Sequence, residues 1–384
     1  MRKTTLRAVA LALAGALALA ACGDAPDDEA DDTADETEDE TDDTEDEGDD
    51  GEDEDDDAEE DDGEEEAMPG EGYRACMITD QGGVDDGSFN ETAFNGLLQA
   101  EEELGVDIDY LESSSETDFE PNMQTFVQQD CDLIVSVGFL LAEVTNEAAD
   151  ANPDQKFAIV DEANPEGYDN LLGLKFETSQ AAFLAGYAAA DFTETGTIGT
   201  YGGINIPTVS IFMDGYLAGA EYYNEQNDAD VEVLGWDGED GQFTGDFESL
   251  DEGRAVTENL LDNGADIIMP VAGPVGGGSA AAMEDRGEGL LIWVDTDGYE
   301  STDFGELMFT SVMKQMDVAV FEAIERVVND EFEGGEYLGT LENEGVDIAP
   351  FHDYEDEVSD ELKEELEEIR QGIIDGDIAY EPEG

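Results

Sequence analysis

The sequence predicts an α/β protein in which parallel β-sheets are covered by helices. From about residue 71 onward, short apolar segments alternate with longer segments of helical periodicity. Alternation at this spacing is typical of parallel sheets with helices between the strands. The segments form two similar sets over about 310 residues, and single hydrophobic cores stop growing near about 250–300 residues. We therefore expect two lobes.

The expected elements follow the chain in two sets. The first set has strands at 74–79, 108–111, 133–137, 157–160 and 171–176, with a helix at 120–129. The second set has strands at 198–201, 231–234, 267–271 and 290–294, with helices at 207–227, 249–263 and 279–286. A last helix at 360–374 carries Leu362, Leu366, Ile369 and Ile373 on one stripe, so it should dock on a core.

A glycine-rich turn separates the first strand from a helix that we expect to open at Ser88. Serine is a favoured N-cap, and Glu91 three residues later completes a capping box. Asp85 and Asp86 are expected to form the turn itself. In an α/β domain, ligands bind at the carboxyl end of such a strand.

The N-terminus has the pattern of a secretory signal. Arg2, Lys3 and Arg7 precede an apolar run at 8–21, which is too short to span a bilayer. The run ends in Leu-Ala-Ala-Cys at Cys22, similar to the lipobox of bacterial lipoproteins. We expect cleavage before Cys22 and acylation by more than one chain, because each buried methylene contributes only about 0.8 kcal/mol. An ordinary signal peptide with a chance cysteine is the alternative.

An acidic segment follows the signal. From 24 to about 66 the chain is nearly all Asp, Glu, Thr and Gly, a composition that cannot bury enough surface to offset its ordering entropy. We expect a disordered tether, with a polyanionic tail that binds metal or protein as the alternative. The predicted organisation is a signal peptide at 1–21, a lipidated cysteine and linker at 22–70, and a folded part at 71–384.

The acidity extends into the folded part. The whole chain has a net charge of −94, and residues 1–70 hold only 31 acids and three bases of its 106 and 12. The remaining 75 acids and nine bases give residues 71–384 a net charge of −66. Salt screens such self-repulsion, which suggests a halophilic organism. The same surface argues against nucleic acid as a partner, because phosphate backbones require Lys and Arg.

Three cysteines and one histidine limit the possible chemistry. Cys76 and Cys131 lie in or beside apolar strand-like segments, where buried free thiols are the common case; a disulfide remains open, although neighbouring parallel strands rarely present its geometry. His352 is the sole histidine. The sequence has no Cys/His metal cluster, nucleophile–base pair or catalytic glycine elbow. We therefore expect no enzyme activity, no metal and no cofactor.

A motif after the first strand carries a family resemblance. The run D-x-G-G-x-D-D-x-S-F-N at 80–90 resembles the first motif of the basic-membrane-protein family, the nucleoside-binding lipoproteins of ABC importers. Later segments match in order at 137–141, 157–161, 197–203, 294–297 and 310–314. Together the resemblance covers roughly 73–332.

The resemblance implies the type I periplasmic-binding fold, in which the chain crosses a hinge three times. We place the crossings near Glu177, Gly298 and Gly334. Lobe 1 would then comprise about 71–176 plus 299–333, and lobe 2 about 177–298 plus 334–384. Two such lobes close on a small molecule in the cleft between them.

The resemblance also implies which residues contact the ligand. Phe89 would stack on a flat base, whereas without the resemblance a core phenylalanine is favoured. Asp161 and Asp295 end strands and accept hydrogen bonds, which suits the hydroxyls of ribose; loop-satisfying aspartates are the alternative. Lys314 would donate to ribose oxygens, against the alternative of a surface lysine. The predicted ligand-binding set is Asp80, Gln81, Phe89, Gly138, Phe139, Asp161, Phe212, Gly273, Asp295 and Lys314.

The roles of Gly273 and Phe212 in this set follow less directly from the resemblance. Gly273 lies in a glycine-rich loop that lacks the Walker pattern, so we expect close approach to the ligand rather than phosphate binding. Phe212 follows Ser210 and Ile211, where the family has basic residues. Asp297 is a lesser candidate, in a run that superficially resembles a calcium loop without the remaining ligand spacing.

The predicted function is capture of nucleosides, with purines favoured, by a lipid-anchored extracellular protein that delivers them to an ABC transporter permease. The ligand should be uncharged, because the cleft has one candidate cation and an anionic surface repels phosphate. The same fold with another ligand such as a sugar, or a sensor lipoprotein without transport, is the first alternative. A carboxylate-pair glycoside hydrolase and a structural ion-binding lipoprotein are the others.

Overall fold

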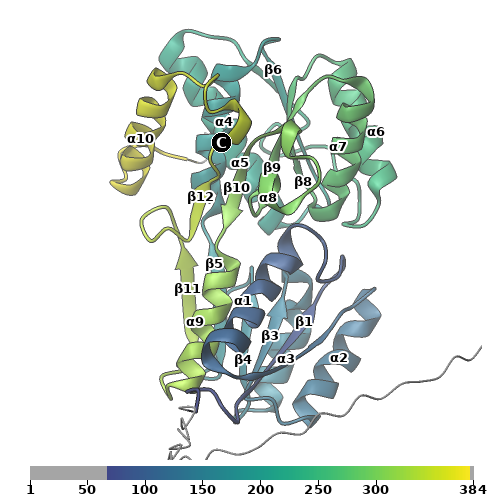
Figure 1. Ribbon diagram of the computed structural model, residues 1–384, viewed down its shortest axis with the longest axis vertical. Coiled ribbons are helices and arrows are strands. Elements are labelled where there is room, and N and C mark those ends of the chain that lie inside the picture. The colour runs from purple at the N-terminus through teal and green to yellow at the C-terminus, as the bar shows by residue number, and fades with distance from the viewer. Residues whose placement is uncertain (1–66, 381–384) are drawn as a thin grey trace, which may run out of the picture. The chain divides into compact units, whose positions relative to one another are not determined.

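Two six-stranded β-sheets, each covered by helices on both faces, make up the described part of the chain (Figure 1). The computed structural model describes residues 67–380. The predicted signal peptide, Cys22 and nearly all of the acidic linker lie outside the described residues. The predicted α/β fold with two parallel-sheet lobes is confirmed.

The first sheet has the strand order β11-β5-β4-β3-β1-β2, with all neighbours parallel. Its strands are β1 (Arg74–Thr79), β2 (Asp107–Leu111), β3 (Leu133–Val137), β4 (Lys156–Val160), β5 (Leu171–Phe176) and β11 (Gly335–Gly339). Its helices are α1 (Phe89–Leu104), α2 (Glu116–Gln128), α3 (Ala142–Ala151) and α9 (Met316–Val328), with a short 3-10 turn η1 (Phe139–Leu141).

The second sheet repeats this pattern in the order β12-β10-β9-β8-β6-β7. Its strands are β6 (Thr197–Gly202), β7 (Glu232–Leu234), β8 (Ile267–Val271), β9 (Leu290–Asp295), β10 (Met308–Lys314) and the antiparallel β12 (Val346–Ile348). Its helices are α4 (Thr178–Phe192), α5 (Pro207–Asn227), α6 (Leu250–Asp262), α7 (Gly276–Arg286), α8 (Gly298–Ser301) and α10 (Asp360–Ile374). Short turns are η2 (Gly273–Val275), η3 (Gly305–Leu307) and η4 (His352–Tyr354).

The alternation of side chains along each strand builds two cores per sheet. In β1, Met77 packs with α1 and α9, whereas Cys76 and Ile78 face α2 and α3. This arrangement follows from the period of two along a strand, which sends neighbouring side chains to opposite faces. In the second lobe, α4 and α5 cover one face and α6 and α7 the other. The predicted apolar stripe of the 360–374 helix is buried on this lobe, which confirms that it docks on a core.

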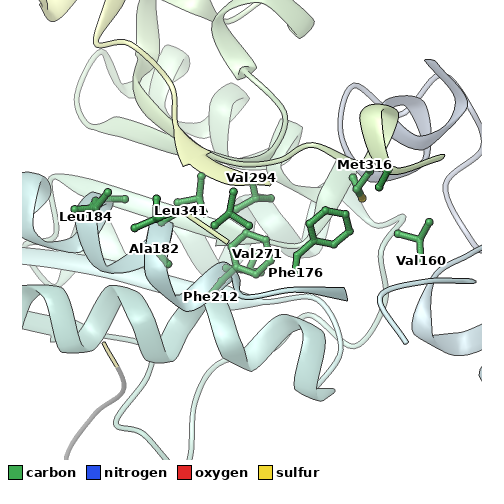
Figure 2. Packing of buried hydrophobic residues seen from close by; sticks show 14 of the residues in the cluster. Val160, Phe176, Ala182, Leu184, Phe212, Val271, Val294, Met316 and Leu341 are labelled. Carbon is green, nitrogen blue, oxygen red and sulfur yellow. The ribbon is translucent and has the colours of Figure 1, made fainter. Parts of the chain in front are cut away.

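One hydrophobic core continues from the first lobe into the second. Figure 2 shows Val160 and Phe176, at strand ends of the first lobe, in the same cluster as Phe212 and Val294 of the second. Leu341, on a connection between the lobes, joins this cluster, and its backbone N–H donates to Gln180 Oε1 (2.9 Å). The hinge region is therefore packed, not a loose linker.

Strand pairing places the hinge crossings differently from the sequence analysis. The first crossing lies at Glu177, between β5 and α4. The second was expected near Gly298, but β10 pairs with β9, so residues up to Lys314 belong to the second lobe. The third was expected near Gly334, but β11 pairs with β5 and the chain returns only between Gly339 and Val346. Both errors arose because β10 and β11 were not predicted as strands.

The two buried cysteines form a disulfide, so the expectation of free thiols is wrong. Cys76 lies in β1, and its Cα is 6.0 Å from the Cα of Cys131. Cys131 is not in the neighbouring strand: β3 begins at Leu133, and the partner of Cys76 in that strand is Ile134. The argument from paired parallel strands therefore did not apply, because the second cysteine lies in the connection before β3.

Candidate functional site

A cavity lies between the two lobes, at the carboxyl ends of their strands. Its empty volume, including the part open to solvent, is about 540 Å³, within the range of small-molecule sites. All ten residues predicted from the sequence line it: Asp80, Gln81, Phe89, Gly138, Phe139, Asp161, Phe212, Gly273, Asp295 and Lys314. The other lining residues are Asp86, Asn90, Ile206, Thr208, Val209, Phe247, Val271, Ala272, Pro274 and Val294.

Strand order explains why this cavity forms where it does. In each sheet the order reverses between the first and third strands along the chain, β1 and β3 in one lobe and β6 and β8 in the other. Connections leave such a switch point in opposite directions, which opens a crevice outside the carboxyl ends. Asp80 follows β1, Gly138 follows β3, and Gly273 follows β8 closely, so residues far apart in the sequence converge.

A buried ion triad connects the lobes at the floor of the cavity. Lys314 is 2 % exposed, and its Nζ lies 2.7 Å from Asp161 Oδ2 and 3.2 Å from Asp295 Oδ1. Asp161 follows β4 in the first lobe, whereas Lys314 and Asp295 end strands of the second. Both aspartates have left-handed backbone, with φ of 63° and 75°, a conformation that Asp tolerates better than most residues. The triad is therefore an interaction between the lobes at the ends of three strands, β4, β9 and β10.

Aromatic rings surround the ammonium group. Lys314 Nζ lies 4.6 Å from the ring centroid of Phe89 and 5.3 Å from that of Phe212. Phe89 opens α1 in the first lobe and Phe212 lies on α5 in the second. Because both rings approach one atom this closely, one planar guest beside that atom can touch both. The departure noted before Phe212, at Ser210 and Ile211, does not move this ring out of the cavity.

Burial raises the pKa of three carboxyl groups in the cavity. Burial raises the pKa of Asp80 well above its usual range, with neighbouring Asp86 and Asp161 adding to the shift. Burial likewise raises the pKa of Asp86 to about 6. It also raises that of Asp161, although Lys314 opposes the shift. For Lys314, burial lowers the pKa, but Asp161 and Asp295 together outweigh it and raise the pKa, so the ammonium stays charged.

The turn before α1 is capped differently from the prediction. Ser88 occupies the N-cap position, but its side chain makes no cap hydrogen bond. Instead, the Asp86 carboxylate accepts hydrogen bonds from the backbone N–H groups of Ser88, Asn90 and Glu91. The Ser88 hydroxyl donates to Asp295 Oδ2 and to the Val294 carbonyl, both 3.1 Å away. The prediction of a capping box is therefore wrong. The Ser88 side chain instead connects the two lobes.

Several lining residues were not among the predicted set. Asn90 is 1 % exposed; its Nδ2 donates to the Gln81 carbonyl (3.0 Å), and its Oδ1 has no partner. Asn90 thus carries a buried, unpaired acceptor in a residue that lines the cavity. Asn90 lies within the quoted 80–90 motif, so its position there was a usable signal. Phe247 lies in a loop without a motif, and its ring reaches the cavity because Gly203 beside it has no side chain.

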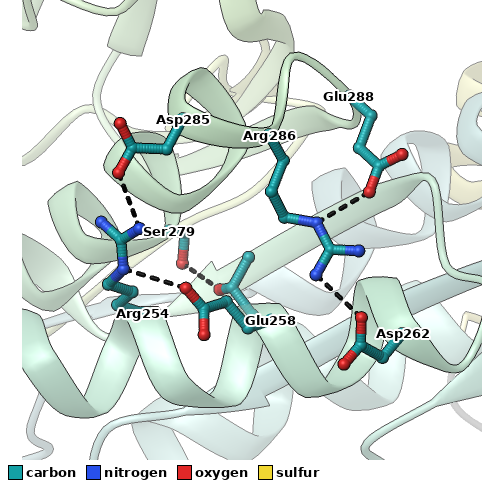
Figure 3. Close-up of polar contacts among 8 residues, drawn as sticks. Arg254, Glu258, Asp262, Ser279, Asp285, Arg286 and Glu288 are labelled. Atoms are coloured by element: carbon teal, nitrogen blue, oxygen red, sulfur yellow. Dashed lines mark hydrogen bonds and ion pairs between the residues drawn. The ribbon is translucent and has the colours of Figure 1, made fainter.

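Other polar clusters lie away from the cavity. Asp297, the lesser candidate, does not line it; the carboxylate accepts from the Tyr299 N–H and lies 2.7 Å from His352 Nε2. Figure 3 shows Arg254 and Arg286 in ion pairs that tie α6 to α7 at the surface. Among the described residues, no group of three or more His, Cys, Asp or Glu could hold a metal ion. Of the described residues that line the cavity, Lys314 is the one with a cationic side chain.

Two parallel-sheet lobes joined by three crossings, with a cavity at opposed strand ends, define a solute-binding protein of the type I periplasmic fold. A family model described as Bmp, "ABC transporter substrate-binding protein PnrA-like", matches residues 74–381. The chain belongs to this family, and the resemblance found in the sequence is confirmed. The family is one of substrate-binding proteins rather than enzymes.

Individual relatives agree with this assignment. The ABC transporter nucleoside-binding protein BmpA of Lactococcus lactis subsp. cremoris is 30% identical over 324 residues, covering 79% of this chain and 88% of the relative. An uncharacterized lipoprotein of Pyrococcus abyssi is 34% identical over 280 residues, covering 71% and 68%. The crystal structure of an ABC transporter system solute-binding protein from Aeropyrum pernix K1 superimposes with a TM-score of 0.73 at 30% identity, covering 80% of this chain and 92% of that one.

Replacing Lys314 by Met tests the ion triad. The substitution leaves two buried carboxylates without their cation, so we expect the free energy of unfolding to fall by about 3–5 kcal/mol at pH 7. Without the lysine, the folded-state pKa of Asp161, which burial already raises, rises further above the unfolded value of about 3.9. The cost should therefore be greatest above the folded pKa and shrink as the pH falls toward 4, because protonation removes the unpaired charge.

Urea unfolding of wild type and variant at pH 7 and pH 4.5 measures this difference. Lys363→Met is the matched control, since Lys363 pairs with the exposed Glu355 and should lose less than about 1 kcal/mol at either pH. An equal loss for Lys314→Met at both pH values would contradict the buried triad.

Proposed function

We propose that this protein captures nucleosides in the interlobe cavity and delivers them to an ABC transporter permease. The observation that supports it best is the combination at one point of two aromatic rings, from Phe89 and Phe212, with the carboxylates of Asp161 and Asp295 around Lys314. A nucleoside presents a flat base for stacking and ribose hydroxyls that both accept from an ammonium and donate to carboxylates. The relative from Lactococcus lactis is itself named as nucleoside-binding.

The cavity also favours an uncharged ligand with donors on its base. Four carboxyl groups, Asp80, Asp86, Asp161 and Asp295, line it with a single ammonium, which disfavours a phosphate. The unpartnered Asn90 Oδ1 and the neighbouring Asp80 carboxyl offer acceptors. Purines are the bases we favour, because their larger rings provide more stacking area for the flanking phenylalanines.

Calorimetry with adenosine, guanosine, inosine and free ribose tests the ligand class. Nucleosides should bind and ribose should not, since ribose lacks the ring that stacks. Phe89→Ala and Asp295→Ala should each lower nucleoside affinity by about tenfold or more, the first through lost stacking and area, the second through lost charged hydrogen bonds. Phe94→Ala is the matched control, because Phe94 lies on the same helix and packs against Tyr110 instead.

Circular dichroism confirms folding of each variant before titration. Nucleoside affinity retained in both Phe89→Ala and Asp295→Ala would refute the site, and binding of ribose alone would redirect the proposal to sugars.

We further propose that the mature protein is anchored by lipid on Cys22 at the extracytoplasmic face of the cell membrane. The disulfide between Cys76 and Cys131 supports an oxidising compartment, and the Pyrococcus abyssi relative is named a lipoprotein. Among the described residues, no helix combines the length and the apolar character needed to cross a bilayer.

Replacing Cys22 by Ser tests the anchor. Wild type should fractionate with membranes and incorporate a labelled fatty acid, whereas Cys22→Ser should do neither, because the acylated thiol is absent. Release of both proteins into the medium to the same extent would show that the leader is an ordinary signal peptide.

We also propose that the organism is halophilic and that the fold requires salt. The folded part carries a net charge of −66, and screening reduces its self-repulsion. The melting temperature should rise by roughly 10 °C or more between 0.1 and 3 M KCl, equivalent to about 6–7 kcal/mol for a folded part of this size. Differential scanning calorimetry in KCl, with matched osmolality of sucrose as the control, measures this; a flat salt curve would rule it out.

A further inference from the structure

A further contact between the lobes lies beside the cavity rather than in it. The Gly87 carbonyl, on the turn before α1, accepts hydrogen bonds from Trp293 Nε1 and from Ser301 Oγ, each 3.1 Å long. Gly87 belongs to the first lobe, whereas Trp293 in β9 and Ser301 at the end of α8 belong to the second. None of the three lines the ligand cavity. We call these three residues the Gly87 latch.

The first-lobe side of the latch is held rigidly. Gly87 has a φ of 63°, in the left-handed region that glycine adopts without strain. Its own N–H donates to Glu91 Oε2 (2.8 Å). The next residues are fixed by the Asp86 carboxylate, which accepts from three backbone N–H groups. The carbonyl therefore points at the second lobe without depending on a ligand.

The second-lobe side is equally well placed. The Trp293 side chain is buried, and its packing requires glycine at two neighbouring positions. A Cβ on Gly276 would come within 2.7 Å of the indole ring, and one on Gly298 within 2.5 Å of the Trp293 side chain. Ser301 is fixed by α8, whose N-cap Asp297 accepts from the Tyr299 N–H. Donors on two different elements thus converge on one acceptor.

We infer that the Gly87 latch is a closure device that determines how long the lobes hold a ligand; the inference rests on the proposed function. Its two hydrogen bonds form only when the lobes are together, so they raise the population of the closed form. A ligand enters the open form and leaves only after the lobes separate, so stabilising the closed form slows dissociation. Because the latch touches no ligand, it contributes the same factor for every ligand that the cavity accepts. Trp293 and Ser301 are therefore positioning residues, and base selectivity lies elsewhere.

Stopped-flow binding to the full chain tests this inference with Trp293→Phe and Ser301→Ala. Each variant removes one donor, so we expect ligand dissociation to be about three- to tenfold faster, by the same factor for adenosine and guanosine. Association should stay within about twofold of wild type, since encounter precedes closure. Small-angle scattering of ligand-free protein should show a larger radius of gyration in both variants.

Two control variants remove comparable hydrogen bonds away from the latch. In Trp236→Phe the lost indole N–H donates to Asp214 within the second lobe (2.8 Å), and in Thr125→Ala the lost hydroxyl donates to the Pro121 carbonyl within α2 (2.8 Å). Both should keep wild-type kinetics and scattering. The chain has two tryptophans, so the Trp236→Phe protein also leaves Trp293 as the sole tryptophan, which can be excited selectively and lies at the contact between the lobes.

The possible outcomes separate the latch from the proposed function. Unchanged dissociation in both latch variants, an equal acceleration in the controls, or a factor that differs between adenosine and guanosine would overturn the latch. If wild type binds no nucleoside, the proposed function fails and scattering alone decides: variants more extended than wild type support the latch, and identical curves reject it.

Discussion

The contact of one buried ammonium with two carboxylates organises the space between the lobes. Lys314 ends β10 in the second lobe, and its Nζ reaches Asp161 of the first lobe at 2.7 Å and Asp295 of its own lobe at 3.2 Å. An ammonium this deeply buried is stable only with its charge balanced. This balance requires the end of β4 in the first lobe to approach the ends of β9 and β10 in the second, so the triad favours the closed arrangement and positions the aromatic rings. Phe89 and Phe212 then flank the same atom from opposite lobes.

The same triad shows why a carboxylate-rich cavity is suited to a neutral guest. Each aspartate of the triad already accepts from the ammonium, and Asp295 also accepts from the Ser88 hydroxyl. A neutral ligand whose hydroxyl groups replace some of these hydrogen bonds leaves the net charge of the cavity unchanged. A ligand with its own negative charge would compete with the aspartates for Lys314, the only cation among the described residues that line the cavity. On the proposed function, the charge pattern of the cavity disfavours a phosphate without any dedicated repulsive residue.

The sequence predicted which residues meet in the cavity more accurately than it predicted the domain boundaries, and both results have physical reasons. Carboxyl ends of parallel strands converge at a switch point, so correct strand ends sufficed to gather Asp80, Asp161 and Asp295 in one cavity. Nine expected strands are found with ends within one residue of the structure. The hinge crossings depended on β10, β11 and β12, which have short, partly polar or ambiguous sequences and gain their strand conformation from pairing with a neighbouring strand.

Local polar geometry was the other source of error. The pattern Ser88 to Glu91 matches a capping box, yet the carboxylate of Asp86 makes the three cap hydrogen bonds. A carboxylate accepts backbone hydrogen bonds more strongly than a hydroxyl does, and its use here frees the Ser88 hydroxyl to reach Asp295 and Val294. That choice depends on the second lobe, which is more than 200 residues away in the chain. No local pattern contains this information.

Neighbouring atoms of the turn at 85–88 therefore serve two proposed purposes, recognition of the ligand and closure of the lobes. Ser88 and the adjacent Phe89 face the cavity region, where identity of the guest is decided, whereas the Gly87 carbonyl faces Trp293 and Ser301 outside it. On the proposed function, contacts of the first kind depend on the ligand, whereas the latch residues lie outside the cavity that holds it. A binding protein that must release its guest to a permease benefits from this separation, because retention can be adjusted at the latch while the cavity keeps its selectivity. Asp86 couples the two, since one carboxylate fixes the backbone that carries both sets of atoms.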